Sequence, residues 1–205
     1  MARPGVVHPL PVRVAHAVNA FAMVCMLMSG WAIYNASPIF AFSFPAWATI
    51  GGWLGGSIAW HFAAMWLLAA NGLLYVVYGL ASGHFRRALL PIRKEELVRD
   101  MRQALRLELP HRPGVYNAVQ RALYVVVLLL GVLVVASGLS IWKPVQLFWL
   151  TDFFGGYDVA RKVHFIAMAG IACFIVIHLL LVLIVPRTIL PMISGSAARR
   201  EAQRW

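Results

Sequence analysis

The sequence predicts an all-α integral membrane protein: a four-helix bundle of up-down-up-down topology, with interfacial segments between the helices, forming one domain over residues 1–205. Three observations predict this fold. The chain of 205 residues is 61% hydrophobic and only 12% charged, and a soluble domain of this size could not bury so much apolar surface. It contains four apolar blocks of spanning length. Its basic residues gather in segments that would share one side of a membrane.

The four spans follow from block length, because a helix needs about 20 apolar residues to cross the hydrocarbon core of a bilayer. The third block is the clearest, since Ala122–Leu139 contains no charged residue, and the fourth block stops at Pro186. The predicted spans are approximately residues 14–34, 58–81, 120–141 and 163–185.

Residues 39–54 are also apolar, but they are not predicted to cross the membrane. Pro45 and the glycine pairs at 51–52 and 55–56 disfavour a continuous helix. The aromatic side chains of this segment suit the boundary between water and lipid: Phe40, Phe42, Phe44, Trp47 and Trp53. The sequence therefore predicts an interfacial loop.

Charge placement supports four spans and orients them. With four spans, residues 1–13, 82–121 and 186–205 share one side and carry 15 of the 18 basic residues, whereas the other side carries three. By the positive-inside rule both termini are cytoplasmic. A fifth span would place the basic segments on opposite sides. The net charge of +11 is therefore explained by contact with membrane lipid, and no nucleic-acid partner is predicted.

The cytoplasmic loop 82–119 contains the stretch Lys94–Leu109, which has an apolar face flanked by arginines. It predicts an amphipathic helix on the inner leaflet. A solvated helix with Glu95 paired to Arg99 is the alternative.

Four of the seven histidines lie in predicted spans: His16, His61, His164 and His178. An ionisable group inside a span is costly and marks a candidate functional site, although a neutral imidazole bonded to a neighbouring helix is the alternative for any one of them. The topology places His61 and His164 near the outer surface and His16 and His178 near the inner surface. His164 and His178 are 14 residues apart, which is about 21 Å along a helix and two heptads, so they share a face.

Two opposed imidazoles at one depth suit axial ligation of a planar iron macrocycle in a bundle core. Zinc fits less well because it takes about four ligands around one point, and no Cys or carboxylate accompanies either pair. A proton relay would need intramembrane carboxylates, which the spans lack. The sequence therefore predicts two stacked haem b groups, ligated by His61 with His164 at the outer level and by His16 with His178 at the inner level.

Arg13 and Arg161 each precede a ligand histidine by three residues. At that spacing the guanidinium lies one turn nearer the membrane surface, where it could pair with a haem propionate. The alternative is that both arginines simply end their spans at the headgroups. Small residues that could face the cofactor are Gly30, Gly72, Gly131, Gly138 and Gly170.

With these residues the chain resembles the di-haem cytochrome b subunits of the bacterial cytochrome b561, nickel-hydrogenase cytochrome b and formate dehydrogenase gamma-subunit group. The resemblance covers essentially the whole chain. It rests on RVAH at 13–16, WHFAAMWLLAANG at 60–72, VYNAVQR at 115–121 and the spacing His164-x13-His178. The stretches GHFRRALLP at 83–91 and VPRTILPMISG at 185–195 are most similar to cytochrome b subunits that accompany periplasmic molybdenum oxidoreductases.

The resemblance implies a bacterial inner (plasma) membrane and electron transfer across it between quinone and a redox partner. In that group an Asn-Ala-Gly-Gln pattern at the start of the third span belongs to a quinone site beside the inner haem. Here it reads NAVQ, so Asn117 and Gln120 are the candidate quinone ligands, and Val119 replaces glycine. The alternative for Asn117 is a helix N-cap.

The expected partners are therefore lipid, quinone and a periplasmic oxidoreductase subunit or soluble electron carrier. The sequence leaves open whether the chain forms a homodimer. It also leaves open whether the chain acts alone, as a superoxide:quinone oxidoreductase of the cytochrome b561 type. A histidine-based transporter or metal permease is a third hypothesis, which predicts no haem absorption.

Overall fold

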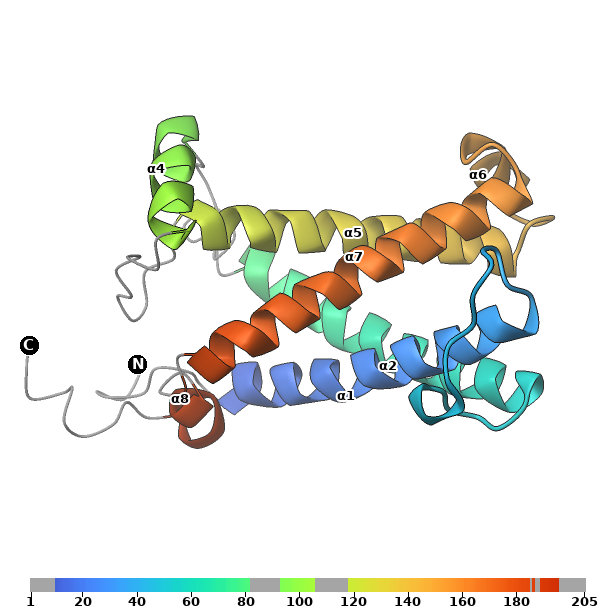
Figure 1. The fold of residues 1–205 in the computed structure, drawn as a ribbon, viewed down its shortest axis with the longest axis horizontal. Coiled ribbons are helices and arrows are strands. Elements are labelled where there is room, and N and C mark those ends of the chain that lie inside the picture. The colour runs from blue at the N-terminus through green and yellow to red at the C-terminus, as the bar shows by residue number, and fades with distance from the viewer. Residues whose placement is uncertain (1–9, 82–92, 106–117, 185, 187–188, 196–205) are drawn as a thin grey trace, which may run out of the picture. The chain divides into compact units, whose positions relative to one another are not determined.

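The computed structural model describes residues 10–81, 93–105, 118–184, 186 and 189–195, and within these ranges it contains helices and no strand (Figure 1). The helices are α1 (Leu10–Ala36), the 3₁₀ helix η1 (Ala46–Ala48), α2 (Leu54–Ala81), α4 (Lys94–Leu105), α5 (Ala118–Trp142), α6 (Phe148–Phe153), α7 (Tyr157–Ile184) and α8 (Ile189–Ser194).

Four of these helices, α1, α2, α5 and α7, are long and apolar enough to cross a membrane, with spanning segments of 25 to 28 residues. At 1.5 Å per residue they reach about 37 to 42 Å, more than the hydrocarbon core of about 30 Å. The prediction of an all-α fold with four helices of spanning length is confirmed.

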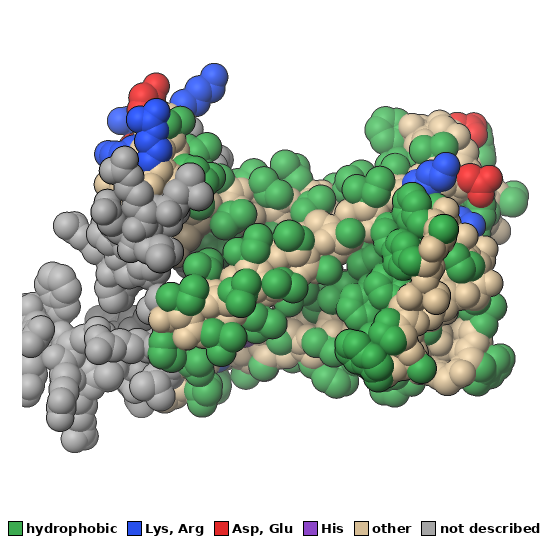
Figure 2. Space-filling model, in the orientation of Figure 1, with side chains coloured by type: hydrophobic (Ala, Val, Ile, Leu, Met, Phe, Trp, Pro, Cys, Tyr) green, Lys and Arg blue, Asp and Glu red, His purple; other side chains and the backbone are tan. Residues whose placement is uncertain are grey.

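The surfaces of the long helices are those of a lipid-embedded protein. Leu74 of α2 is 70% exposed, Val132 of α5 is 69% exposed and Leu183 of α7 is 72% exposed. Figure 2 shows hydrophobic side chains covering the visible surface of the long helices, whereas charged side chains gather over α4 and around α6. Such apolar exposure is costly in water and costs nothing in a bilayer.

Local sequence explains where the helices begin and end. Proline follows the last residue of α1, α5 and α7 within two residues, at Pro38, Pro144 and Pro186, and the residue before a proline is biased away from the helical conformation. Glycines with positive φ precede α2 (Gly51 and Gly52) and α7 (Gly155 and Gly156). At Gly51 a Cβ atom would come within 2.4 Å of the backbone nitrogen of Ser57, so only glycine fits this turn.

The segment between α1 and α2 contains only the short η1, as the prediction of a non-spanning loop requires. Side chains at the end of α1 form hydrogen bonds with the backbone of this segment. Asn35 both donates to the Phe44 carbonyl and accepts from the Phe44 N–H, each at 2.8 Å. The Tyr34 hydroxyl bonds the carbonyl and the N–H of Phe40, both at 3.2 Å. The loop is therefore fixed at the level of its backbone.

The chain divides into two compact units, one of residues 1–77 and 178–205 and the other of residues 78–177. In the first unit the Asn71 amide of α2 donates to the Asn19 side chain at 2.6 Å and to the Ala15 carbonyl of α1 at 2.9 Å. In the second unit Ser140 of α5 donates to the Thr151 hydroxyl of α6 at 3.1 Å. In each unit, hydrogen bonds between polar side chains thus connect neighbouring helices, and these polar groups would have no partners if they faced lipid.

Candidate functional site

The first unit brings His16 of α1 and His178 of α7 together. Their ring centroids are 6.2 Å apart and their planes are inclined by 54°. A metal–imidazole bond is about 2 Å long, and adding about 1 Å from ring atom to centroid on each side separates two opposed ligand rings by about 6 Å. The observed spacing therefore fits two imidazoles on opposite sides of one iron atom.

His61 of α2 is held by a serine of α1 in the same unit. The Nδ1 atom of His61 lies 3.0 Å from the hydroxyl oxygen of Ser29, and that hydroxyl donates to the Cys25 carbonyl at 2.5 Å. Ser29 is fully buried. The Ser29 hydroxyl has one hydrogen, and it donates this hydrogen to the Cys25 carbonyl. The serine oxygen therefore accepts a hydrogen bond from His61, and Nδ1 is the protonated ring nitrogen.

His164 of α7 has a similar environment in the second unit, with one further acceptor. Its Nδ1 atom lies 3.2 Å from the hydroxyl oxygen of Ser137 and 3.0 Å from the Val134 carbonyl, both on α5. The Ser137 hydroxyl donates to the Leu133 carbonyl at 2.7 Å. A carbonyl can only accept, so Nδ1 again carries the hydrogen and Nε2 is the nitrogen with a lone pair.

Each of these serines is followed by a glycine that faces the same imidazole. A Cβ atom at Gly30 would lie 3.5 Å from Cε1 of His61, and one at Gly138 would lie 3.1 Å from Cε1 of His164. These two glycines thus face histidine rings. Of the other predicted cofactor-facing glycines, Gly170 lies against Leu130, whereas a Cβ atom at Gly72 or Gly131 would have nothing within 4 Å among the described residues.

The serine–glycine pair is a repeated element that the sequence reasoning missed. The residues around it read SGWAIY at 29–34 and SGLSIW at 137–142. Both stretches share serine, glycine, an isoleucine and a final aromatic residue at the same spacing, near the end of a span that precedes a histidine-bearing span. That shared pattern is the signal that could have found it.

The two predicted propionate arginines occupy different settings. Arg13 lies in the first turn of α1, and its guanidinium donates to the Met192 carbonyl at 3.1 Å and to the Ile193 carbonyl, at the end of α8. A cation at this position satisfies carbonyls that a helix end leaves without intrahelical partners. Arg161 is half-buried in the second turn of α7, one turn before His164.

Of the two predicted quinone residues, Asn117 lies outside the described residues and Gln120 is half-buried in the first turn of α5. Helix α4 fixes that turn. The buried Asp100 carboxylate accepts from the Ala118 N–H at 2.9 Å, and Glu96 pairs with Arg121 at 2.9 Å. The first N–H of α5 thus has a carboxylate partner, which also suits the positive end of the helix dipole.

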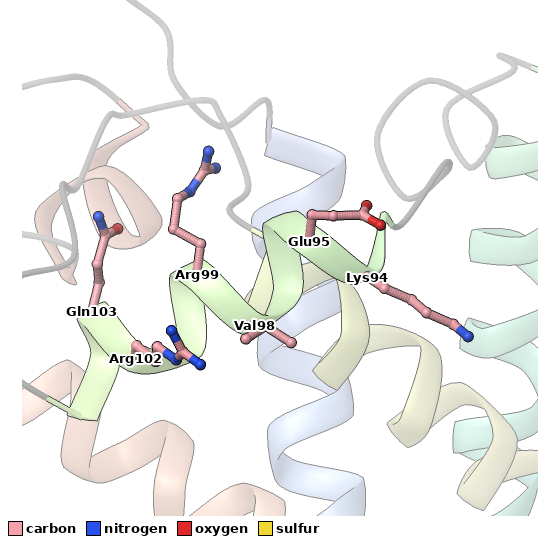
Figure 3. Close-up of a pocket in the computed structure, with 6 residues that line it drawn as sticks. All are labelled: Lys94, Glu95, Val98, Arg99, Arg102 and Gln103. Atoms are coloured by element: carbon pink, nitrogen blue, oxygen red, sulfur yellow. The ribbon is translucent and has the colours of Figure 1, made fainter.

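Helix α4 itself confirms the helix expected in the cytoplasmic loop, over Lys94–Leu105. Residues 106–109 of the expected helix lie outside the described part of the chain. Arg99 lies 3.1 Å from Asp100, its neighbour in sequence. A shallow recess runs along α4 (Figure 3), and it is lined by Lys94, Glu95, Val98, Arg99, Arg102 and Gln103. None of the four in-span histidines lines this recess.

Comparison with known proteins decides the family. The family model described as prokaryotic cytochrome b561 matches residues 7–195. The chain belongs to the prokaryotic cytochrome b561 family. It is therefore a multi-pass membrane protein of a haem b–binding electron-transport family.

One relative is similar over nearly the whole chain. The chain is 45% identical over 190 residues to the putative protein-methionine-sulfoxide reductase subunit YedZ1 of Azospira oryzae. The alignment covers 92% of this chain and 96% of the relative. No solved structure matches the chain significantly.

Proposed function

We propose that the chain is a di-haem membrane cytochrome b that transfers electrons between the quinone pool and a redox partner on the periplasmic side of a bacterial inner membrane. The observation that carries the proposal is the pair of imidazoles of His16 and His178 at 6.2 Å, in a chain of the cytochrome b561 family. These two residues hold the inner haem, and His61 with His164 hold the outer one.

Within this proposal the haems supply one-electron redox chemistry, and the chain positions them and adjusts their environment. The histidines provide Nε2 ligands. Arg13 and Arg161 stabilise propionate charge. The two bonds from Arg13 to α8 use two of its five N–H groups, which leaves capacity for a propionate.

Asn117 and Gln120 are proposed to bind the quinone near the start of α5, by hydrogen bonds to its carbonyl oxygens. The spans contain no row of carboxylates that could carry protons across the membrane. The protons of the quinol are therefore released on the quinone side, which we place at the cytoplasmic face.

The relative suggests what the partner does. Its printed name makes it a subunit of a reductase for methionine sulfoxide in proteins. Reducing one sulfoxide to the thioether and water takes two electrons and two protons, and oxidation of one quinol supplies two electrons. We therefore propose flow from quinol through this chain to a periplasmic reductase. That partner is of the molybdenum class that the flanking sequence stretches favour.

The first experiment is to purify the full chain and record reduced-minus-oxidised spectra of the protein and four variants, in which His16, His61, His164 or His178 is changed to Ala. We expect two low-spin b haems in the wild type. Loss of one haem is expected in each variant, the same one for His16 and His178 and the other for His61 and His164. A wild type without haem contradicts the proposal, and retention of both haems in any variant contradicts the ligand assignment.

The second experiment tests the direction and the partner. The chain is placed in vesicles with reduced quinone and its co-purified periplasmic oxidoreductase, and oxidation of the quinol is followed after a methionine-sulfoxide protein is added. Oxidation that needs both the partner and the sulfoxide supports the proposal. Quinone reduction by superoxide in the isolated chain, with no partner, would instead favour the free-standing oxidoreductase.

A further inference from the structure

Two histidines in different halves of the chain have the same hydrogen-bonding arrangement. In each case a fully buried serine on the preceding span accepts a hydrogen bond from Nδ1–H of the histidine, and its own hydroxyl donates to the carbonyl four residues earlier. The pairs are Ser29 with His61 and Ser137 with His164. Helix-to-helix packing alone requires neither the hydroxyl nor this direction of the bonds.

We propose that Ser29 and Ser137 are positioning residues that prepare His61 and His164 as haem ligands. The inference rests on the proposed function and extends it to two residues that have no other assigned role. Ser29 fixes one tautomer of His61, and Ser137 together with the Val134 carbonyl fixes the same tautomer of His164. The hydrogen is on Nδ1 and the lone pair on Nε2, the form in which a neutral imidazole binds a metal. Each serine also limits rotation of the ring, because the Nδ1–H must point at a fixed oxygen.

The same hydrogen bond adjusts the iron. Donation from Nδ1–H to an oxygen makes the imidazole a stronger electron donor, which stabilises the ferric state and lowers the midpoint potential of the haem. Removing the serine oxygen should therefore raise the potential of the haem bound by that histidine. The other haem should not respond, because its ligands His16 and His178 are not bonded to either serine.

Two buried serines provide matched controls. Ser57 of α2 is 1% exposed, and its hydroxyl lies 2.9 Å from the Ile50 carbonyl and 3.0 Å from the Trp53 carbonyl. Ser140 of α5 is fully buried and bonds Thr151. Changing either to Ala removes the same atom from a similarly buried site without touching a histidine.

The test is a potentiometric titration of the two b haems in the full chain carrying Ser29→Ala, Ser137→Ala, Ser57→Ala or Ser140→Ala. Each haem is identified by which histidine variant lacks it. We expect Ser29→Ala to raise the potential of the haem lost in His61→Ala. We expect a change of about tenfold in the ferric-to-ferrous equilibrium, the lower end of the effect that losing such a partner has on metal affinity or activity. For one electron this is about 59 mV.

Ser137→Ala should raise the potential of the haem lost in His164→Ala by less, because the Val134 carbonyl still accepts from Nδ1–H of His164. Both controls should leave both potentials unchanged. Ser29→Thr and Ser137→Thr, which keep a hydroxyl, should retain haem and the wild-type potentials. If an Ala variant loses its haem, the Thr variant at the same position tests the inference. Retention of haem in the Thr variant supports the role of the hydroxyl, and loss of haem there overturns it. Unmoved potentials, or equal shifts in the controls, also overturn it. A wild type without haem would refute the proposed function instead.

Discussion

Gly138 and Gly30 both face a histidine ring, but there is less space beside Gly138. We therefore predict that adding a methyl group weakens haem binding at Gly138 and not at Gly30. A Cβ atom at Gly138 would lie 3.1 Å from Cε1 and 3.4 Å from Nδ1 of His164, whereas one at Gly30 would lie 3.5 and 3.8 Å from the same atoms of His61. Carbon atoms in comfortable contact are about 3.5 to 4.0 Å apart. Gly138→Ala therefore has to move the ring by about 0.4 Å or more, and Gly30→Ala does not.

The size of the effect follows from what holds the His164 ring. The added methyl group pushes the ring away from α5, the helix that carries both acceptors of its Nδ1–H. The distances of 3.0 Å to Val134 and 3.2 Å to Ser137 would lengthen to about 3.4 and 3.6 Å, the second beyond hydrogen-bonding range. Overpacking of this kind costs about 1 to 3 kcal/mol. When this cost falls on the haem-binding form, haem affinity drops by roughly 5- to 150-fold.

The assay is haem content per protein, from the ratio of Soret to protein absorbance, during titration of haem-depleted protein with haem. Gly138→Ala should bind the outer haem more weakly than the wild type, and Gly30→Ala should match the wild type. Equal weakening in both variants would show that the glycines matter for a reason other than these contacts. Full affinity in Gly138→Ala would show that the His164 ring is not held as described.

Three further predictions concern stability and are measured on the full chain in detergent. Asp100→Ala removes the acceptor of the Ala118 N–H and should speed hydrogen exchange in the first turn of α5 by an amount equal to about 1 kcal/mol; unchanged exchange there would contradict the capping role. Asn71→Ala removes both bonds to α1 and should lower the free energy of unfolding by about 1 kcal/mol, and an unchanged unfolding curve would show that the pair does not join the helices. Removal of haem should lower the melting temperature, since a ligand at a thousand times its Kd stabilises the protein that binds it by about 4 kcal/mol; equal melting of the haem-free and haem-loaded chains would argue against bound haem.

The fold was predictable because spans are set by local properties. Block length and hydropathy determine where a helix can cross a bilayer. Prolines and glycines mark where it must stop, so Pro45 and the glycine pairs, with the interfacial aromatics and the placement of charge, excluded residues 39–54 as a span. Helix α4 was predictable for the same reason, since an apolar face of helical period needs no knowledge of the rest of the chain.

The candidate site was only partly predictable from the sequence. The in-span histidines stood out because ionisable residues are rare in spans. Ser29 and Ser137 did not, because serine is common in membrane helices and usually bonds its own backbone. Only packing shows which serine meets a histidine. The bonds from Arg13 to α8 were likewise invisible, since they join residues 179 and 180 positions apart.

The loop between α1 and α2 has a consequence for how the protein can diversify. Its path is fixed by Tyr34, Asn35 and the bond from the Ile50 N–H to the Met28 carbonyl, and on the loop side all of these bonds meet backbone atoms. Trp47 and Trp53 remain 83% and 74% exposed. The exposed side chains can therefore be exchanged without shifting the end of α1 that carries Ser29. The exposed surface of this loop can therefore change in sequence while the geometry around His61 stays the same.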